Sequence, residues 1–113
     1  MTRYLGFLMR EEGNVFASIT VATVNPDRVV DIASLYEKVL PTLKATRGWL
    51  GVYVVVNRTS GAGHLLGLWE TEADAEAFET SGAFQAVLAQ YPPGILTAPP
   101  TRTIGEVVFQ ASR

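Results

Sequence analysis

The sequence predicts an α+β fold of the ferredoxin-like kind, with a βαββαβ order of elements and an antiparallel sheet. Two observations predict it. Stretches rich in β-branched and apolar residues alternate with segments of helical spacing, and a glycine-rich turn joins the middle two stretches. The length of 113 residues suits one domain. We therefore expect a single domain over residues 1–113, with residues 1–13 forming an N-terminal extension or an edge strand.

The first strand and the first helix are predicted from the residues on either side of Asn25. Residues 15–24 read VFASITVATV and contain no strand breaker. Asn25 and Pro26 then favour a helix start, because an asparagine side chain can cap the first turn and proline fits there. The helix should run to about Thr46, and Pro41 should kink or divide it. Its expected buried stripe consists of Val29, Ile32, Ala33, Tyr36, Leu40 and Leu43.

A hairpin is predicted after this helix. Gly48 is placed to end the helix in a left-handed conformation, and residues 49–57 (WLGVYVVVN) read as the second strand. Residues 58–63 contain two glycines, which allow a tight turn. Residues 64–70 (HLLGLWE) read as the third strand, so the second and third strands form the hairpin.

The last third of the chain predicts an interrupted helix, an irregular segment and a final strand. Thr71 can cap the second helix, and Gly82 should break it before a further helical stretch over residues 83–90. Residues 91–100 contain four prolines and many apolar side chains. This segment should therefore be irregular but packed against the protein. Residues 102–110 supply the last strand.

The composition excludes several classes of function. Nine basic residues are scattered among eleven acidic ones, so nucleic acid is not an expected partner. The absence of cysteine excludes disulfides and thiolate metal sites. No apolar run approaches the roughly 20 residues that cross a bilayer, so no membrane association is expected. The N-terminal segment has no small-residue cleavage site, which makes a cytoplasmic protein the default expectation.

Both faces of the predicted sheet carry apolar side chains, which predicts a homodimer. In the second strand Val52 and Val54 alternate with Tyr53 and Val55. Two helices on one face of a four-stranded sheet leave the other face bare. The same sheet from a second copy of the chain is the simplest cover for that face. We therefore expect two copies to form a dimeric α+β barrel.

Three segments carry a resemblance to a known family: residues 67–78 (GLWETEADAEAF), residues 81–84 (SGAF), and residues 102–109 (RTIGEVVF) after the proline-rich return. Together they resemble the dimeric α+β barrel superfamily, in particular its antibiotic-biosynthesis monooxygenase branch. The resemblance implies a pocket between sheet and helices. There oxygen would react directly with an electron-rich phenolic or polyketide-like compound, without a metal, a flavin or any other cofactor.

Trp69 is the catalytic candidate that the resemblance implies, because quinone-forming members carry a tryptophan at the end of the same strand. The sequence departs from those members at two positions: Leu65 stands where they have asparagine, and Ala75 where they have tyrosine. Phe78 and Leu88 stand where haem-degrading members have tryptophan and histidine, so haem is not expected. The alternative interpretation of Trp69 is a large core residue.

His64 is the one histidine, and so the second catalytic candidate, as a general base. Strand alternation places it on the face opposite Trp69, which favours a surface or dimer-contact role. A metal site is not expected, because one histidine with scattered carboxylates has no ligand spacing.

Five residues are candidates for binding the substrate. The tyrosines could offer hydroxyls to a phenol or carbonyl, although core tyrosines with satisfied hydroxyls are the alternative. The glycine leaves room beside Trp69, either for a ligand or for a crossing helix. The phenylalanine marks the buried side of the second helix. These candidates are Tyr36, Tyr53, Tyr91, Gly67 and Phe78.

Two functions lead at this point, and a purely structural interaction module is a third alternative. One is a cofactor-independent monooxygenase of the quinone-forming type, acting on an aromatic or polyketide-like small molecule beside Trp69. The other is a non-catalytic dimeric barrel that binds an apolar small molecule for sensing, stress protection or carriage. The missing polar partners at Leu65 and Ala75 favour the second function.

Overall fold

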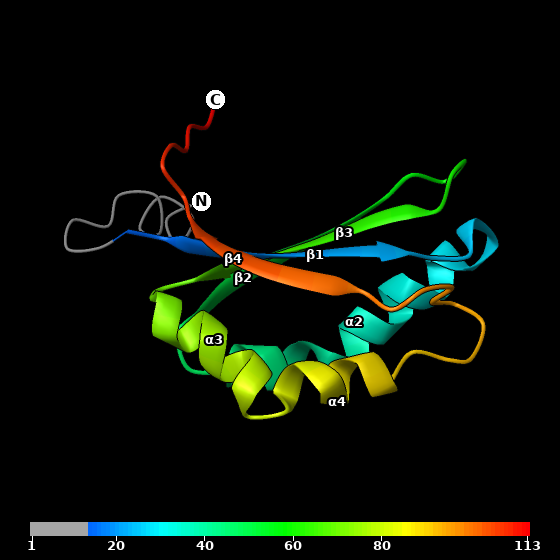
Figure 1. The fold of residues 1–113 in the computed structure, drawn as a ribbon, viewed down its shortest axis with the longest axis horizontal. Helices are drawn as coiled ribbons and strands as arrows, with labels where there is room; N and C mark the ends of the chain where they lie inside the picture. Colours follow the sequence, from blue (N-terminus) through cyan, green and yellow to red (C-terminus); the bar gives the residue numbers. More distant parts are fainter. Residues whose placement is uncertain (1–13) are drawn as a thin grey trace.

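The computed structural model describes residues 14–113, and the predicted N-terminal extension or edge strand lies outside this range. Four strands form one antiparallel sheet in the order β2-β3-β1-β4. The sheet and its connections have the predicted ferredoxin-like topology (Figure 1). The strands are β1 (Phe16–Thr23), β2 (Trp49–Val56), β3 (Ala62–Trp69) and β4 (Thr101–Glu106).

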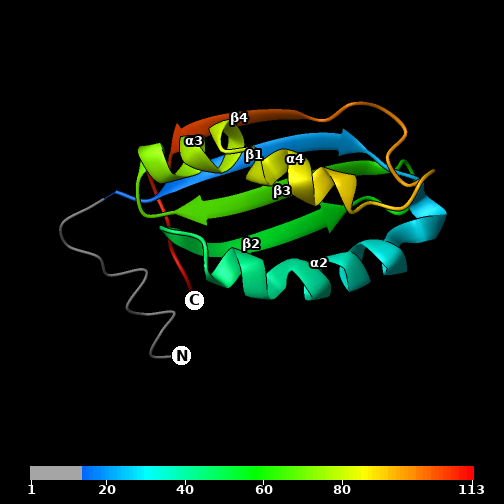
Figure 2. The same cartoon turned by 90° about the horizontal axis from the view of Figure 1, so that it is seen from below.

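The helices of residues 14–113 lie on one face of this sheet, and none of them covers the other face (Figure 1). Helix α2 follows the β2 side, while α3 and α4 lie end to end across the other half (Figure 2). The helical elements are η1 (Pro26–Arg28), α2 (Val29–Lys44), α3 (Glu72–Thr80) and α4 (Ala83–Ala89). No helix in residues 14–113 has the length and apolar character needed to cross a bilayer.

The residues predicted to cap or interrupt the helices do so in the structure. The Asn25 side chain accepts a hydrogen bond of 3.0 Å from the Asp27 amide at the start of η1. Thr71 accepts one of 3.0 Å from the Asp74 amide at the start of α3. Gly82 separates α3 from α4 with a φ of 89°, a conformation that favours glycine. These contacts fix where the chain enters and leaves the helical layer.

Three expectations were wrong in detail. The predicted buried stripe of α2 is wrong at Ala33, which is exposed, while Leu35 is buried. Helix α2 is not divided at Pro41, and a kink there stays a prediction. Pro41 lies in the last turn, so its missing amide costs one bond, while Leu43 beyond it is buried in the core. Strand β4 ends at Glu106 rather than Gln110. The amide of Val107 still donates a hydrogen bond to the Val15 carbonyl. No pairing between β4 and β1 is described beyond this bond, and residues 108–113 are exposed.

The core divides into two clusters between the sheet and the helices. The larger consists of Leu43, Trp69, Ala75, Phe78, Phe84 and Val87. The smaller consists of Val24, Ile32 and Ile95. Ile95 comes from the proline-rich segment and is completely buried, and Leu96 bridges to Val24 at the end of β1. The expectation that this segment packs against the protein is therefore confirmed.

Gly67 is required by close packing beside Trp69. A Cβ atom there would lie 2.6 Å from the Ser18 hydroxyl oxygen and 3.1 Å from the Trp69 indole nitrogen. We expect Gly67→Ala to lower the free energy of unfolding by about 1–3 kcal/mol through overpacking. Chemical denaturation followed by circular dichroism measures this. Gly105→Ala is the matched control, since a Cβ there meets nothing within 4 Å; equal effects of the two changes would contradict the prediction.

The face of the sheet away from the helices carries exposed apolar side chains. We call Ile19, Val21, Tyr53 and Val55, which are 40–57% exposed in one copy of the chain, the open face. They form two rows across the sheet, because Ile19 and Tyr53 flank Leu66 and the two valines flank His64. A surface of this kind favours burial against another protein surface.

Candidate functional site

A small cavity of about 30 Å³ lies between the sheet and the helical layer. Its walls come from the helix side of β1, β2 and β3, from α2 and α4, and from the proline-rich segment. The volume corresponds to about two water molecules. Most of the lining is apolar, and it contains no aspartate, glutamate, lysine or arginine. The lining residues are Thr20, Ala22, Val24, Ile32, Tyr36, Val54, Val56, Gly63, His64, Leu65, Leu88, Tyr91, Leu96 and Pro100.

Two of the predicted ligand-binding tyrosines meet at this cavity. The hydroxyl oxygens of Tyr36, on α2, and Tyr91, just after α4, are 2.8 Å apart and share a hydrogen bond. Their rings pack edge to face with centroids 6.1 Å apart. Burial raises the pKa of Tyr36, and the nearby Tyr91 hydroxyl raises it further. Burial also raises the pKa of Tyr91. Both hydroxyls therefore stay protonated at neutral pH and can only act as neutral hydrogen-bonding groups.

The buried tyrosine pair predicts a loss of stability at alkaline pH. Above the ordinary tyrosine pKa of 10.0 the unfolded chain releases protons that the folded protein retains. The stabilisation is therefore fully present below pH 10 and is lost as pH rises above it. Unfolding measured from pH 9 to about 12 should show this decline, and the Tyr36→Phe/Tyr91→Phe variant should show a smaller one. Equal declines in both proteins would contradict the assignment.

Thr20 supplies a third hydroxyl to the cavity, from the sheet. Thr20 is only 4% exposed, and its hydroxyl oxygen has no hydrogen-bond partner among residues 14–113. Sequence reasoning missed this residue. Ser18 and Thr20 alternate in β1 and share its inner face, but a threonine in a strand is ordinary, so the sequence alone does not mark this position.

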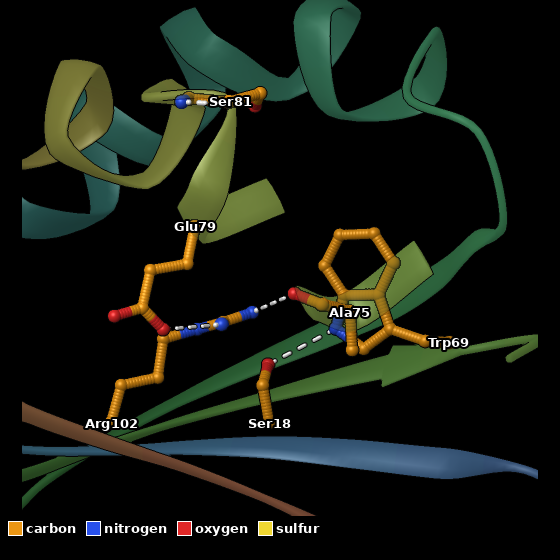
Figure 3. Close-up of polar contacts among 7 residues, drawn as sticks. Ser18, Trp69, Ala75, Glu79, Ser81 and Arg102 are labelled. Atoms are coloured by element: carbon orange, nitrogen blue, oxygen red, sulfur yellow. Dashed lines mark hydrogen bonds and ion pairs between the residues drawn. The ribbon is translucent and has the colours of Figure 1, made fainter. Parts of the chain in front are cut away.

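Trp69 lies in the larger core cluster rather than in the lining of the cavity. It is 2% exposed, and its indole nitrogen donates a hydrogen bond of 3.0 Å to the Ser18 hydroxyl (Figure 3). The Phe78 ring packs against it with centroids 5.3 Å apart. The structure thus brings the candidates Trp69 and Phe78 together, and Tyr36 packs against the same cluster while its hydroxyl meets that of Tyr91.

The remaining candidates do not offer side chains to the cavity. The space left by Gly67 is occupied by the Ser18 hydroxyl and the Trp69 indole. Tyr53 is 53% exposed on the open face. His64 borders the cavity along β3, but its side chain is exposed and lies in one row with Val21 and Val55. No group of three or more histidine or carboxylate side chains in the described part of the chain could hold a metal ion.

Arg102 is a buried cation that sequence reasoning also missed. Its side chain is 3% exposed, and it donates hydrogen bonds to Glu79 (3.2 Å) and to the Ala75 carbonyl (3.0 Å), as Figure 3 shows. The guanidinium also lies over the Phe84 ring, 5.2 Å from its centroid. These contacts tie β4 to α3 beside the aromatic core. A charged residue on the inner face of a predicted strand was the signal for it.

Several solved structures have the same fold. A Bordetella bronchiseptica protein, assigned by name to the antibiotic biosynthesis monooxygenases, superposes with a TM-score of 0.70 at 21% identity, covering 85% of this chain and 99% of that one. The heme degrader MhuD from Mycobacterium tuberculosis, solved with two hemes in its active site, gives 0.68 at 14% identity, covering 86% and 99%. The ActVA-Orf6 monooxygenase of Streptomyces coelicolor, in complex with Nanaomycin D, gives 0.66 at 17% identity, covering 89% and 93%.

These similarities establish the fold, which is that of the antibiotic biosynthesis monooxygenases, as the sequence resemblance implied. No protein-family model and no curated protein matches the sequence. Function must therefore be argued from the site itself.

Proposed function

We propose that this protein is a cofactor-independent monooxygenase that takes a neutral, electron-rich aromatic compound into the cavity between sheet and helices. The observation that carries the proposal is the apolar cavity with the neutral Tyr36–Tyr91 hydroxyl pair at its edge. Small-molecule sites in proteins have this character, with apolar walls and a few polar groups that fix orientation. Two structures of the same fold hold small molecules, hemes in one and Nanaomycin D in the other, which supports a small-molecule ligand for this fold.

The proposed reaction converts a phenol or anthrone to a quinone. One atom of O₂ becomes the new carbonyl oxygen and the other leaves as water. In an anthrone both hydrogens of that water come from the methylene carbon that is oxidised, and in a phenol one comes from the oxidised ring carbon and the other from the phenol hydroxyl. The substrate supplies all the electrons. The protein would hold the ring away from bulk water and orient its oxygen through the tyrosine hydroxyls.

Trp69 acts as a positioning residue in this proposal. Its indole holds Ser18, which lies on the inner face of β1 two residues before Thr20. His64 takes no part, because its exposed side chain belongs to the open face. A substrate as large as an anthrone must also separate the lining residues, since pockets for such molecules are roughly ten times larger than the present cavity.

Binding without reaction is the second candidate function. The cavity contains no charged side chain, and Leu65 lines it where quinone-forming relatives would place an asparagine. A substrate therefore finds no built-in base to remove its proton. This arrangement suits a carrier or sensor of a neutral apolar compound as well as it suits catalysis.

Oxygen uptake separates the two candidates. Purified protein is incubated with 1,8-dihydroxyanthrone in air, and dissolved oxygen and quinone absorbance are followed together. The monooxygenase proposal expects a rate above the uncatalysed oxidation, with one O₂ consumed for each quinone formed. Saturable binding of the anthrone with no added rate would instead select the carrier or sensor. The Tyr53→Phe variant controls for the loss of a tyrosine hydroxyl outside the cavity. Because Tyr53 lies on the open face, this variant should consume oxygen at the wild-type rate.

We also propose that two copies associate through the open face. Its exposed apolar side chains come from the two strands β1 and β2 on either side of β3, so they form one continuous surface. A second copy presents the same surface, and packing the two faces buries both without leaving a further apolar face exposed.

A further inference from the structure

The Thr20 hydroxyl is an anomaly within the inner face of the sheet. Ser18 lies two residues earlier on the same face, is buried to the same extent, and receives a hydrogen bond from Trp69. Thr20 has no such partner among the described residues, although burying an unpaired hydroxyl is costly. Valine has almost the same shape and would fill this position without that cost. The hydroxyl can therefore bond to a molecule held in the cavity beside it.

Thr20 lines the cavity from β1, and Tyr36 lines it from α2, in the helical layer beneath the sheet (Figure 1). Its neighbours across the sheet are Leu65 and Arg102, and the arginine is already bonded to Glu79 and Ala75. The hydroxyl is thus free to bond to a molecule inside the cavity. A threonine hydroxyl can donate to a carbonyl and can accept from a hydroxyl.

The residues that line the cavity restrict the class of ligand that can bind there. No charged side chain lines the cavity, so nothing there would compensate a charged ligand for its lost hydration. The tyrosine hydroxyls are neutral and bond to each other, whereas the Thr20 hydroxyl has no hydrogen-bond partner among the described residues. A neutral ligand with an apolar ring body and one carbonyl or hydroxyl oxygen matches these walls.

We propose that Thr20 is a specificity-determining residue, whose hydroxyl bonds the carbonyl or hydroxyl oxygen of a neutral, ring-containing ligand in the cavity. This inference rests on the proposed function only in using the same cavity, and it does not require that the ligand react. It also gives the site a direction, because the ligand oxygen that bonds Thr20 then lies against the sheet, opposite the tyrosine hydroxyls of the helical layer.

The test compares two probes and three proteins. The probes are 1-tetralone and tetralin, which share a two-ring skeleton and differ in the carbonyl group. The proteins are the wild type, Thr20→Val, which removes the hydroxyl, and Thr20→Ser, which keeps it. Affinities come from NMR titrations. We expect 1-tetralone to bind Thr20→Val about tenfold more weakly than the wild type, and Thr20→Ser to retain most of the affinity. Tetralin should bind all three proteins with the same affinity.

The melting temperature shows that the variant is folded. Thr20→Val should melt at or above the wild-type temperature, since it removes an unpaired buried hydroxyl. Equal affinity of 1-tetralone for the wild type and Thr20→Val would overturn the inference, as would no binding to the wild type.

The same data keep this inference distinct from the proposed activity. Binding that depends on Thr20 without any oxygen uptake from 1,8-dihydroxyanthrone would uphold the role of Thr20 and remove the monooxygenase. Unchanged oxygen uptake together with unchanged 1-tetralone affinity in Thr20→Val would overturn the role of Thr20 and leave the monooxygenase standing.

Discussion

Replacing Trp69 by alanine is expected to lower the free energy of unfolding by about 3–5 kcal/mol. The indole is 2% exposed, packs on Phe78, and donates its hydrogen bond to Ser18. Alanine would leave a cavity in the larger core cluster and a buried serine hydroxyl without this partner. Small domains are stable by only about 5–15 kcal/mol, so this one change removes a large part of the total.

Equilibrium denaturation in urea measures the effect. Phe109→Ala is the matched control, because this aromatic side chain is 82% exposed and its loss should change stability little. A loss below about 1 kcal/mol for Trp69→Ala would mean that Trp69 is not the centre of a packed core. That outcome would indicate that Trp69 lines an open pocket instead.

Replacing Val55 by aspartate is expected to convert the proposed dimer into monomers. Val55 is 57% exposed in one copy and lies on the open face beside His64. In a face-to-face dimer the new carboxylate would be buried without a partner, which costs several kcal/mol for each copy. The helical layer of each copy is not touched by the change, so the monomer should remain folded.

Sedimentation at micromolar concentration measures this prediction. Val30→Asp is the matched control, since Val30 is a 71% exposed valine on α2, away from the open face. The wild type and Val30→Asp should sediment as dimers, and Val55→Asp as a folded monomer. A stable wild-type monomer would contradict the dimer, and dimeric Val55→Asp would place its interface elsewhere.

The order of elements could be predicted because each boundary has a local chemical signal. Asn25 and Thr71 cap helices through contacts that span two or three residues, and Gly82 breaks a helix through its own backbone. The end of β4 could not be predicted in this way. It depends on where β1 stops offering partners, which is a property of the assembled sheet.

The site was predicted less completely, because its geometry depends on long-range contacts. Tyr36 and Tyr91 are 55 residues apart in the chain, and nothing in the local sequence shows that their hydroxyls meet. The resemblance drew attention to Trp69, but Ser18 and Phe78 hold it within the core. Thr20 was missed because a threonine in a strand is ordinary, and only the absence of a described partner distinguishes it.

An NMR titration with 1,8-dihydroxyanthrone under argon shows whether the ligand binds in the cavity. Without oxygen the compound binds but is not consumed. We expect chemical-shift changes concentrated on Thr20, Ile32, Leu65 and Leu88, which surround the cavity. Shifts confined to the open face around Val21, or no shifts at saturating compound, would contradict binding in the cavity.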